Sequence, residues 1–192
     1  MRIVGGRFKG RAISAPAGRD TRPTSDRARE AIFNILDHAP WSPGLTDRRV
    51  IDLFAGSGAL GFEALSRGAA FALFVETDPG ARGAIRDTVE AFSLFGTTRI
   101  HRRDATDLGV KPAGVGAPFD LVFADPPYGR GLALPALTGL VRGDWITPDA
   151  LIVLEVGADE TPALTGFTEL DTRTYGAAKV LFLTPEASPP VA

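Results

Sequence analysis

The chain of 192 residues contains no cysteine and two histidines, His38 and His101. Disulfide bonds and thiolate metal sites are therefore excluded, and the sequence predicts no metal site. A cysteine-free composition also agrees with a cytoplasmic location. The sequence lacks an apolar run of about 18 residues and the charged-then-apolar start of a signal peptide, so we expect neither a membrane-spanning helix nor a secretory leader.

Charge is unevenly distributed along the chain, although the formal net charge is only −2. Residues 1–30 carry eight basic and three acidic side chains, whereas the remaining 162 residues carry 13 basic and 20 acidic ones. A basic N-terminal segment on an acidic body indicates that this segment contacts a polyanionic partner. A solvated tail is the alternative. The candidate RNA-binding residues are Arg7, Lys9, Arg11, Arg22, Arg27 and Arg29.

Three regions are expected along the chain. Residues 1–40 form a basic arm, which consists of a small β-rich segment over residues 1–22 and a helix that Thr24 or Ser25 caps and that ends near His38. Apolar residues mark the buried face of this helix, which leaves Arg27 and Arg29 off that face. Residues 41–184 form the main domain, and residues 185–192 form a loose tail. With 44% hydrophobic residues, the chain can bury one substantial core, and we expect a monomer.

Strands and helices alternate in the main domain. Apolar strands are expected over residues 50–54, 71–76, 119–125 and 151–156, and a short strand over residues 99–102. Helices are expected over residues 59–67, from Asp78-Pro79 onward and near residues 132–140. Two further strands near residues 168–174 and 178–184 form a closing hairpin. This pattern predicts an α/β fold with a mostly parallel sheet that is covered on both faces.

A glycine-rich turn, AGSGALG at residues 55–61, joins the first strand to the first helix of the main domain. Gly56, Gly58 and Gly61 spell GxGxxG, and Glu76 follows Gly56 by twenty residues. This spacing is typical of a dinucleotide-binding site, so an NAD-dependent oxidoreductase is one interpretation.

Asp52, in the strand just before the glycine turn, favours a different cofactor. A carboxylate at this position repels a pyrophosphate but attracts the ammonium and sulfonium groups of S-adenosylmethionine. Asp52, Glu76 and Asp104 all stand at the carboxyl ends of successive strands, where open α/β sheets bind ligands. The alternative roles are a hydrogen bond from a loop amide to Asp52 and a helix-capping role for Glu76.

The fourth strand ends in DPPY, residues 125–128. Pro126 and Pro127 have no N–H group and cannot continue a sheet ladder, so a simple proline turn is one interpretation. A rigid clamp for a planar amine is the other: Asp125 and the carbonyl of Pro126 accept the two amine hydrogens, and the ring of Tyr128 stacks on a base, for about 1–3 kcal/mol. Transfer is then an in-line displacement promoted by positioning. Asp125 is also a candidate acceptor for the proton that the amine loses.

The chain resembles the bacterial family of 16S ribosomal RNA guanine-N2 methyltransferases. The segments that carry the resemblance are RIVGGRFKGRAI (2–13), RPTSDRAREAIFNIL (22–36), DLFAGSGALGFEALSRGA (52–69), VETD (75–78), RRDA (102–105) and DPPY (125–128). It implies a class I Rossmann-like methyltransferase fold with seven strands and an antiparallel C-terminal hairpin. It also implies that Asp125 to Tyr128 hold a guanine. The implied contacts to S-adenosylmethionine are Asp52, Phe54, Ala55, Gly56, Ser57, Gly58, Glu76, Thr77, Asp104, Ala105 and Asp125.

Other functions remain open at this point. Related enzymes act on RNA in assembling small subunits, so the arm is expected to dock on 16S ribosomal RNA or a ribosomal protein. Closure of Arg22 to Arg29 over the cofactor is the alternative. The same clamp also suits adenine N6 or cytosine N4 of DNA, or a protein amide. A protein that binds RNA through the arm and never methylates is a third class.

Overall fold

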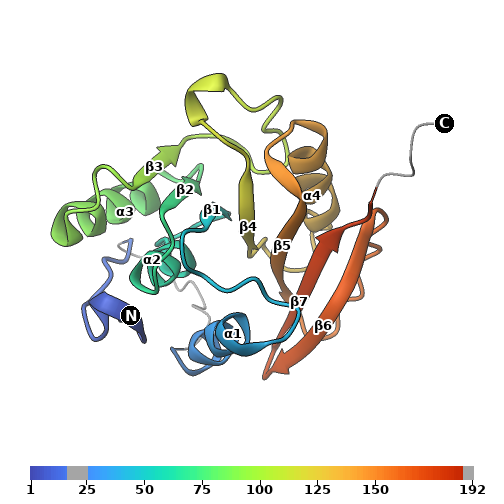
Figure 1. The fold of residues 1–192 in the computed structure, drawn as a ribbon, viewed down its shortest axis with the longest axis horizontal. Coiled ribbons are helices and arrows are strands. Elements are labelled where there is room, and N and C mark those ends of the chain that lie inside the picture. The colour runs from blue at the N-terminus through green and yellow to red at the C-terminus, as the bar shows by residue number, and fades with distance from the viewer. Residues whose placement is uncertain (17–25, 188–192) are drawn as a thin grey trace.

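The computed structural model describes residues 1–16 and 26–187, and these residues form one mixed seven-stranded sheet with helices on both faces (Figure 1). The helices are α1 (Asp26–His38), α2 (Ala59–Ser66), α3 (Pro79–Phe92) and α4 (Ala133–Arg142), and two 3-10 turns are η1 (Gly6–Phe8) and η2 (Ala113–Val115). The strands are β1 (Arg49–Leu53), β2 (Phe71–Val75), β3 (Thr98–His101), β4 (Phe119–Ala124), β5 (Ile146–Gly157), β6 (Phe167–Tyr175) and β7 (Ala178–Pro185).

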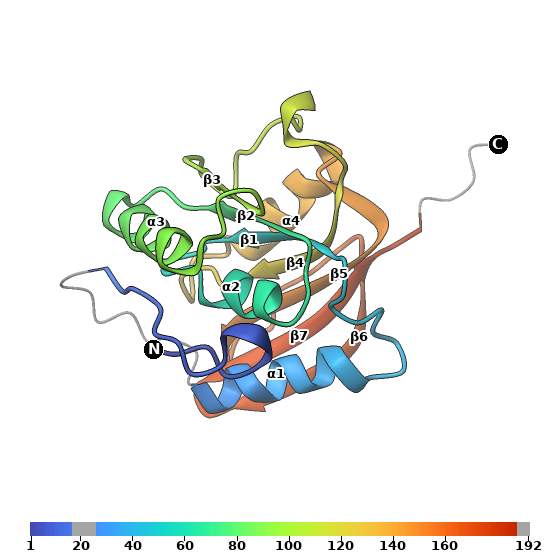
Figure 2. The ribbon, with the colours of Figure 1, turned by 60° about the vertical axis from the view of Figure 1, so that its left-hand side comes forward.

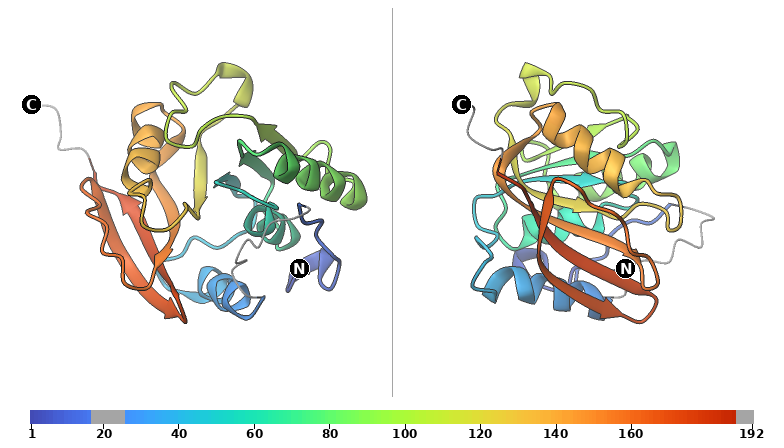
Figure 3. Two further views of the ribbon diagram at one scale, coloured as in Figure 1. Left: turned by 180° about the vertical axis from the view of Figure 1, so that it is seen from behind. Right: turned by 90° about the vertical axis from the view of Figure 1, so that its right-hand side faces the viewer.

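The strand order is β3-β2-β1-β4-β5-β7-β6. Strands β1 to β5 are parallel, and β7 runs antiparallel to both β5 and β6. The predicted α/β fold with an antiparallel closing hairpin is therefore confirmed, and Figure 3 shows this hairpin at one edge of the sheet. Strand β5 begins at Ile146, five residues earlier than predicted. Its first residues lie before a register shift in the pairing with β4, and they include Pro148 and Asp149, which are unfavourable in strands, so the sequence pattern does not predict them.

Each face of the sheet has its own apolar core. Helices α1 and α2 and the N-terminal residues cover one face, where Phe33 packs on Phe123 with ring centroids 5.5 Å apart. Helix α4 covers the other face through Leu137 and Leu140. Figure 2 shows α1 and α2 on one side of the sheet and α4 on the other. None of the helices in the described ranges is long and apolar enough to cross a bilayer.

The N-terminal arm differs from the β-rich segment that the sequence predicts. Residues 1–16 contain one antiparallel bridge, between Arg2 and Ala12, and the turn η1. Side chains of α2 and α3 bind the backbone of the arm: Glu63, Ser66 and Thr88 accept hydrogen bonds from the N–H groups of residues 4, 8 and 14. Because helix side chains satisfy these N–H groups, the arm needs no sheet ladder. Residues 17–25, including the proposed caps of α1, lie outside the described residues.

The prediction that Arg29 lies off the buried face of its helix is wrong, whereas its contact with RNA stays a prediction. Its side chain is only 1% exposed, and it lies between α1 and the arm, where it donates to the carbonyl of Arg2 and to Asp26 at 2.9 Å. Its Nε lies 3.7 Å from Glu63, which also receives Arg67 at 2.9 Å. Helix α1 is therefore buried on two faces: its apolar face packs on the sheet, and the arm covers the face that carries Arg29. The apolar periodicity of the helix predicts only the first of these faces.

The tail begins one residue later than predicted, since Pro185 is the last residue of β7. The N–H of Glu186 still donates to the carbonyl of Gly166 at 2.9 Å. Residues 188–192 lie outside the described part of the chain. The division into an arm of residues 1–40 and a domain of residues 41–184 stays a prediction, although Ile3 and Ile32 pack in the same core as Phe123.

Replacing Glu63 by Ala should lower the free energy of unfolding by about 3–5 kcal/mol, because it leaves two partly or fully buried guanidinium groups without their shared carboxylate. Chemical denaturation measures this change. Glu90→Ala, an exposed change on α3, is the control and should stay within about 0.5 kcal/mol of the wild type. Equal stability of the two variants would contradict a structural role for the Glu63 network.

Candidate active site

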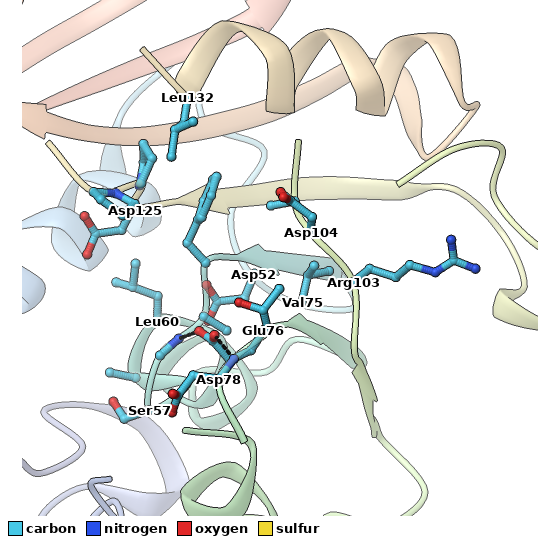
Figure 4. Close-up of a pocket in the computed structure, with 18 of the residues that line it drawn as sticks. Asp52, Ser57, Leu60, Val75, Glu76, Asp78, Arg103, Asp104, Asp125 and Leu132 are labelled. Atoms are coloured by element: carbon cyan, nitrogen blue, oxygen red, sulfur yellow. Dashed lines mark hydrogen bonds between the residues drawn. The ribbon is translucent and has the colours of Figure 1, made fainter. Parts of the chain in front are cut away.

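The carboxyl ends of β1, β2 and β4 open into a cavity of about 1030 Å³ (Figure 4). This is where the strand order changes direction, with β2 on one side of β1 and β4 on the other. Every residue that the sequence predicts for the cofactor or the amine clamp lines this cavity except Gly58. The structure therefore gathers side chains from four successive strand ends, although their contacts with a ligand stay predictions.

The glycine turn has the backbone that a close approach requires. Gly58 precedes α2 with φ +77°, in the left-handed region, and its N–H donates to the carbonyl of Ala55 at 2.7 Å. A side chain on Gly61 would stand 2.4 Å from the ring of Phe74. Gly58 thus allows the backbone of the turn to adopt its conformation, but it does not line the cavity.

Asp52 lies at the base of the cavity and is 2% exposed. Its carboxylate accepts a hydrogen bond from the N–H of Gly61 at 3.0 Å, so the alternative of a loop-amide partner is observed. Burial is the main reason that the pKa of Asp52 lies well above its usual value; the Gly61 bond opposes this rise, and the charges of Asp125 and Glu76 add to it. A cation in the cavity would offset this cost and favour the ionised form of Asp52.

Glu76 links the two loops that follow β1 and β2. One carboxylate oxygen accepts from the N–H of Gly56 at 2.8 Å, and the other accepts from the N–H of Asp78 at 2.7 Å. Each oxygen keeps a further lone pair that can face the hydroxyl groups of a ribose. The capping alternative for Glu76 is wrong, since Asp78 caps α3 by accepting from the N–H of Ala81 at 2.8 Å.

Asp104 stands at the exposed rim of the cavity. One of its oxygens accepts from the N–H of Thr106 at 2.8 Å and from the hydroxyl of Thr106 at 2.7 Å. These two bonds, the backbone bond first, lower the pKa of Asp104 below its usual value. The carboxylate is therefore held ionised and in a fixed orientation, with its other oxygen available to a ligand.

The DPPY turn is anchored to the end of β5. The hydroxyl of Tyr128 donates to Glu155 at 2.6 Å, while Glu160 accepts from the N–H groups of Gly129 and Gly157 at 2.9 and 3.0 Å. Burial, and then the charge of Glu155, raise the pKa of the Asp125 carboxyl to about 8. Burial and the bond to Glu155 also raise the pKa of Tyr128, so its hydroxyl stays protonated.

Two cationic side chains in the cavity wall were missed from the sequence. Arg130 follows the DPPY turn and Arg103 precedes Asp104, and both line the cavity. Figure 4 shows the side chain of Arg103 extending away from the carboxylates. Each of these arginines is close in sequence to a predicted site motif, and this proximity could have indicated that they line the cavity. Met1 also lines the cavity, and no sequence pattern indicates this.

The predicted RNA-binding residues have different environments. Arg7, Lys9, Arg11 and Arg27 are exposed. The guanidinium of Arg11 lies over the ring of Phe92, 4.1 Å from its centroid, and donates to the carbonyl of Ala91. Arg22 lies outside the described residues. The described part of the chain holds no group of three or more His, Asp or Glu placed to bind a metal ion.

The sheet order, the glycine turn, the acidic strand ends and the DPPY turn around one cavity define a Rossmann-like methyltransferase that uses S-adenosylmethionine. This class replaces the oxidoreductase interpretation. The chain belongs to the family described as conserved hypothetical protein 95, whose model matches residues 1–184.

Known relatives agree with this class. The chain is 37% identical over 155 residues to the ribosomal RNA small subunit methyltransferase D of Escherichia coli (strain K12), covering 81% of this chain and 74% of the relative. It is 33% identical over 179 residues to the protein of the same description from Haemophilus influenzae, covering 92% and 89%. The solved structure of a methyltransferase from Escherichia coli matches with a TM-score of 0.78 and 31% identity, covering 98% of this chain and 99% of that one.

Replacing Asp125 by Asn should stabilise the protein in a pH-dependent way. The pKa of Asp125 is raised from 3.8 to about 8 in the folded state, so ionisation of this carboxyl weakens folding progressively as the pH rises between these values. The Tm of Asp125→Asn should therefore exceed that of the wild type above about pH 8, and the difference should vanish near about pH 4. Circular dichroism melts measure both.

The matched control is Asp149→Asn, an exposed change at the start of β5. Its Tm difference from the wild type should not grow with pH. A pH-independent Tm difference for Asp125→Asn would contradict the raised pKa.

Proposed function

We propose that this protein transfers the methyl group of S-adenosylmethionine to the exocyclic N2 of a guanine in 16S ribosomal RNA, within the assembling small subunit. The observation that carries the proposal is the DPPY turn, held rigidly at a cavity large enough for a cofactor and a base. The description of the Escherichia coli and Haemophilus influenzae relatives as ribosomal RNA small subunit methyltransferases supports ribosomal RNA as the substrate.

The residues present fit the cofactor. Its chemistry is that of a methyl group on a positively charged sulfur, which leaves as the neutral thioether. Asp52 and Glu76 supply negative charge beside this cation, and the backbone of the glycine turn allows a close approach at the start of α2. Asp104, held ionised at the rim, adds an acceptor for the polar groups of the cofactor.

The clamp gives the reaction its geometry. Asp125 and the carbonyl of Pro126 accept the two hydrogens of the amine, which directs the nitrogen lone pair toward the methyl group. Pro126 and Pro127 contribute no N–H group that would compete for these acceptors. The ring of Tyr128, 40% exposed, is available to stack on the base. The guanine leaves its stack to reach the cavity, at a cost of about a few kcal/mol.

The cations around the site are suited to the RNA backbone. Arg7, Lys9 and Arg27 are exposed on the arm and at the start of α1, and Arg103 and Arg130 stand at the cavity. Their charge favours a phosphate chain over a neutral substrate. The clamp by itself also suits adenine N6, cytosine N4 or a protein amide, and the descriptions of the relatives are what favour ribosomal RNA. We expect the protein to act as a monomer in the cytoplasm.

Replacing Asp125 by Ala should reduce methyl transfer to small-subunit RNA by at least about 10²-fold, because the amine loses an acceptor and the reaction loses its proton acceptor. Binding of S-adenosylmethionine, measured by calorimetry, should change by less than about tenfold, since the Asp52 and Glu76 contacts remain. Asp149→Ala is the control for transfer. Full activity of Asp125→Ala would contradict the clamp.

Replacing Lys9 or Arg130 by Ala should weaken RNA binding and reduce its salt dependence. Each lost phosphate contact should lower the slope of log affinity against log salt by about one. Arg142→Ala, an exposed cation at the end of α4 on the opposite face of the sheet, should leave the slope unchanged. Fluorescence anisotropy with a 16S RNA fragment measures the slopes, and equal slopes for all variants would mean that these cations do not contact the RNA.

A further inference from the structure

Glu155 is a buried carboxylate that the proposed reaction does not yet use. It lies in β5 and is only 6% exposed. Leu154 of β5 pairs with Ala124 of β4, so the next residue on each strand, Glu155 and Asp125, stand side by side at the end of the sheet. An apolar residue would fill this place in β5 at a lower desolvation cost, so the carboxylate needs an explanation.

The first contact of Glu155 is with the clamp. Its carboxylate accepts the hydroxyl of Tyr128 at 2.6 Å, a short bond between a neutral donor and a carboxylate. Tyr128 follows two prolines and precedes Gly129, whose N–H is held by Glu160. The hydroxyl bond therefore fixes the far end of a ring whose backbone is already restrained, while 40% of the residue remains open to a base.

The second effect of Glu155 is on Asp125. The negative charge of Glu155 adds to burial in disfavouring the ionised form of Asp125. Asp52 on β1 acts in the same direction through space, since it and Asp125 raise each other's energy when both are charged. Two further charged groups are close to the site. The charge of Glu160 acts on Tyr128, and Arg29 of α1 is a cation in the wall of the same cavity. An Asp125 carboxylate in this setting binds a proton more strongly than an isolated one.

We propose that Glu155 is a positioning residue for the methyl transfer, which orients the ring of Tyr128 and makes Asp125 the acceptor of the amine proton. This inference rests on the proposed amino-methyltransferase function. The amine nitrogen forms the new N–C bond with its lone pair, and the C–S bond breaks with both electrons on sulfur. Asp125 takes the proton that the nitrogen then loses and passes it to solvent, which returns the carboxylate for the next cycle.

The test variant is Glu155→Gln, which keeps an oxygen that accepts the Tyr128 hydroxyl but removes the charge. In the pH profile of kcat/KM for RNA, the wild-type rate falls on the acid side as Asp125 becomes protonated. This acid limb should shift to lower pH in Glu155→Gln, and the loss of kcat on the plateau should be far smaller than the about 10²–10⁴-fold loss expected for removal of a general base. Glu169→Gln, an exposed change on β6, should retain the wild-type profile.

A second measurement does not depend on activity. The pH-dependent rise in Tm caused by Asp125→Asn should be smaller in a Glu155→Gln background, because Asp125 then carries a lower pKa before it is replaced. An unchanged Tm difference in that background, or a pH profile of Glu155→Gln that coincides with that of the wild type, would overturn the role of Glu155. A wild type that methylates no RNA would refute the proposed function instead, and the Tm cycle would still decide whether Glu155 controls Asp125.

Discussion

The parallel register of four neighbouring strands determines where each polar group of the site lies. Leu53 of β1 pairs with Val75 of β2 and with Ala124 of β4, and Ala124 pairs with Leu154 of β5. The residues that follow these positions therefore stand in one row at the edge of the sheet: the glycine turn, Glu76, Asp125 and Glu155. A shift of one residue in the register of any strand pair would move apolar side chains out of the core and a carboxylate into it. The apolar cores on both faces therefore fix the register, and the register fixes the positions of the site residues.

The same row concentrates negative charge in a largely apolar setting. Asp52 and Asp125 both have raised pKa values, chiefly because they are buried. This is a stability cost that a positively charged cofactor would offset, because a cation favours the ionised form of nearby carboxylates. The DPPY turn is fixed at Tyr128 by Glu155 and at Gly129 by Glu160, and these bonds restrain the backbone that carries Asp125.

Much of the fold and most of the cavity could be predicted, because they depend on local patterns: the apolar strands, the GxGxxG turn and the DPPY turn. Long-range packing explains the failures. Arg29 is expected to be exposed from the pattern of its own helix, but the arm and Glu63 of α2 both contact its buried side chain. The backbone of the arm bonds to side chains of α2 and α3, more than fifty residues away, and so forms no strands. Glu155 stands inside an apolar strand thirty residues after Asp125, and no spacing rule connects the two.

The most direct test of the central claim is the identity of the methylated nucleoside. Small-subunit particles that lack methylation at the target guanine would be incubated with the protein and S-adenosylmethionine carrying a labelled methyl group. Their RNA would then be digested and analysed by mass spectrometry. The account predicts labelled N2-methylguanosine, with no label in the ribosomal proteins. Label in N6-methyladenosine, in a cytosine or in a protein amide would leave the amine clamp in place but contradict guanine N2 of 16S RNA as its target.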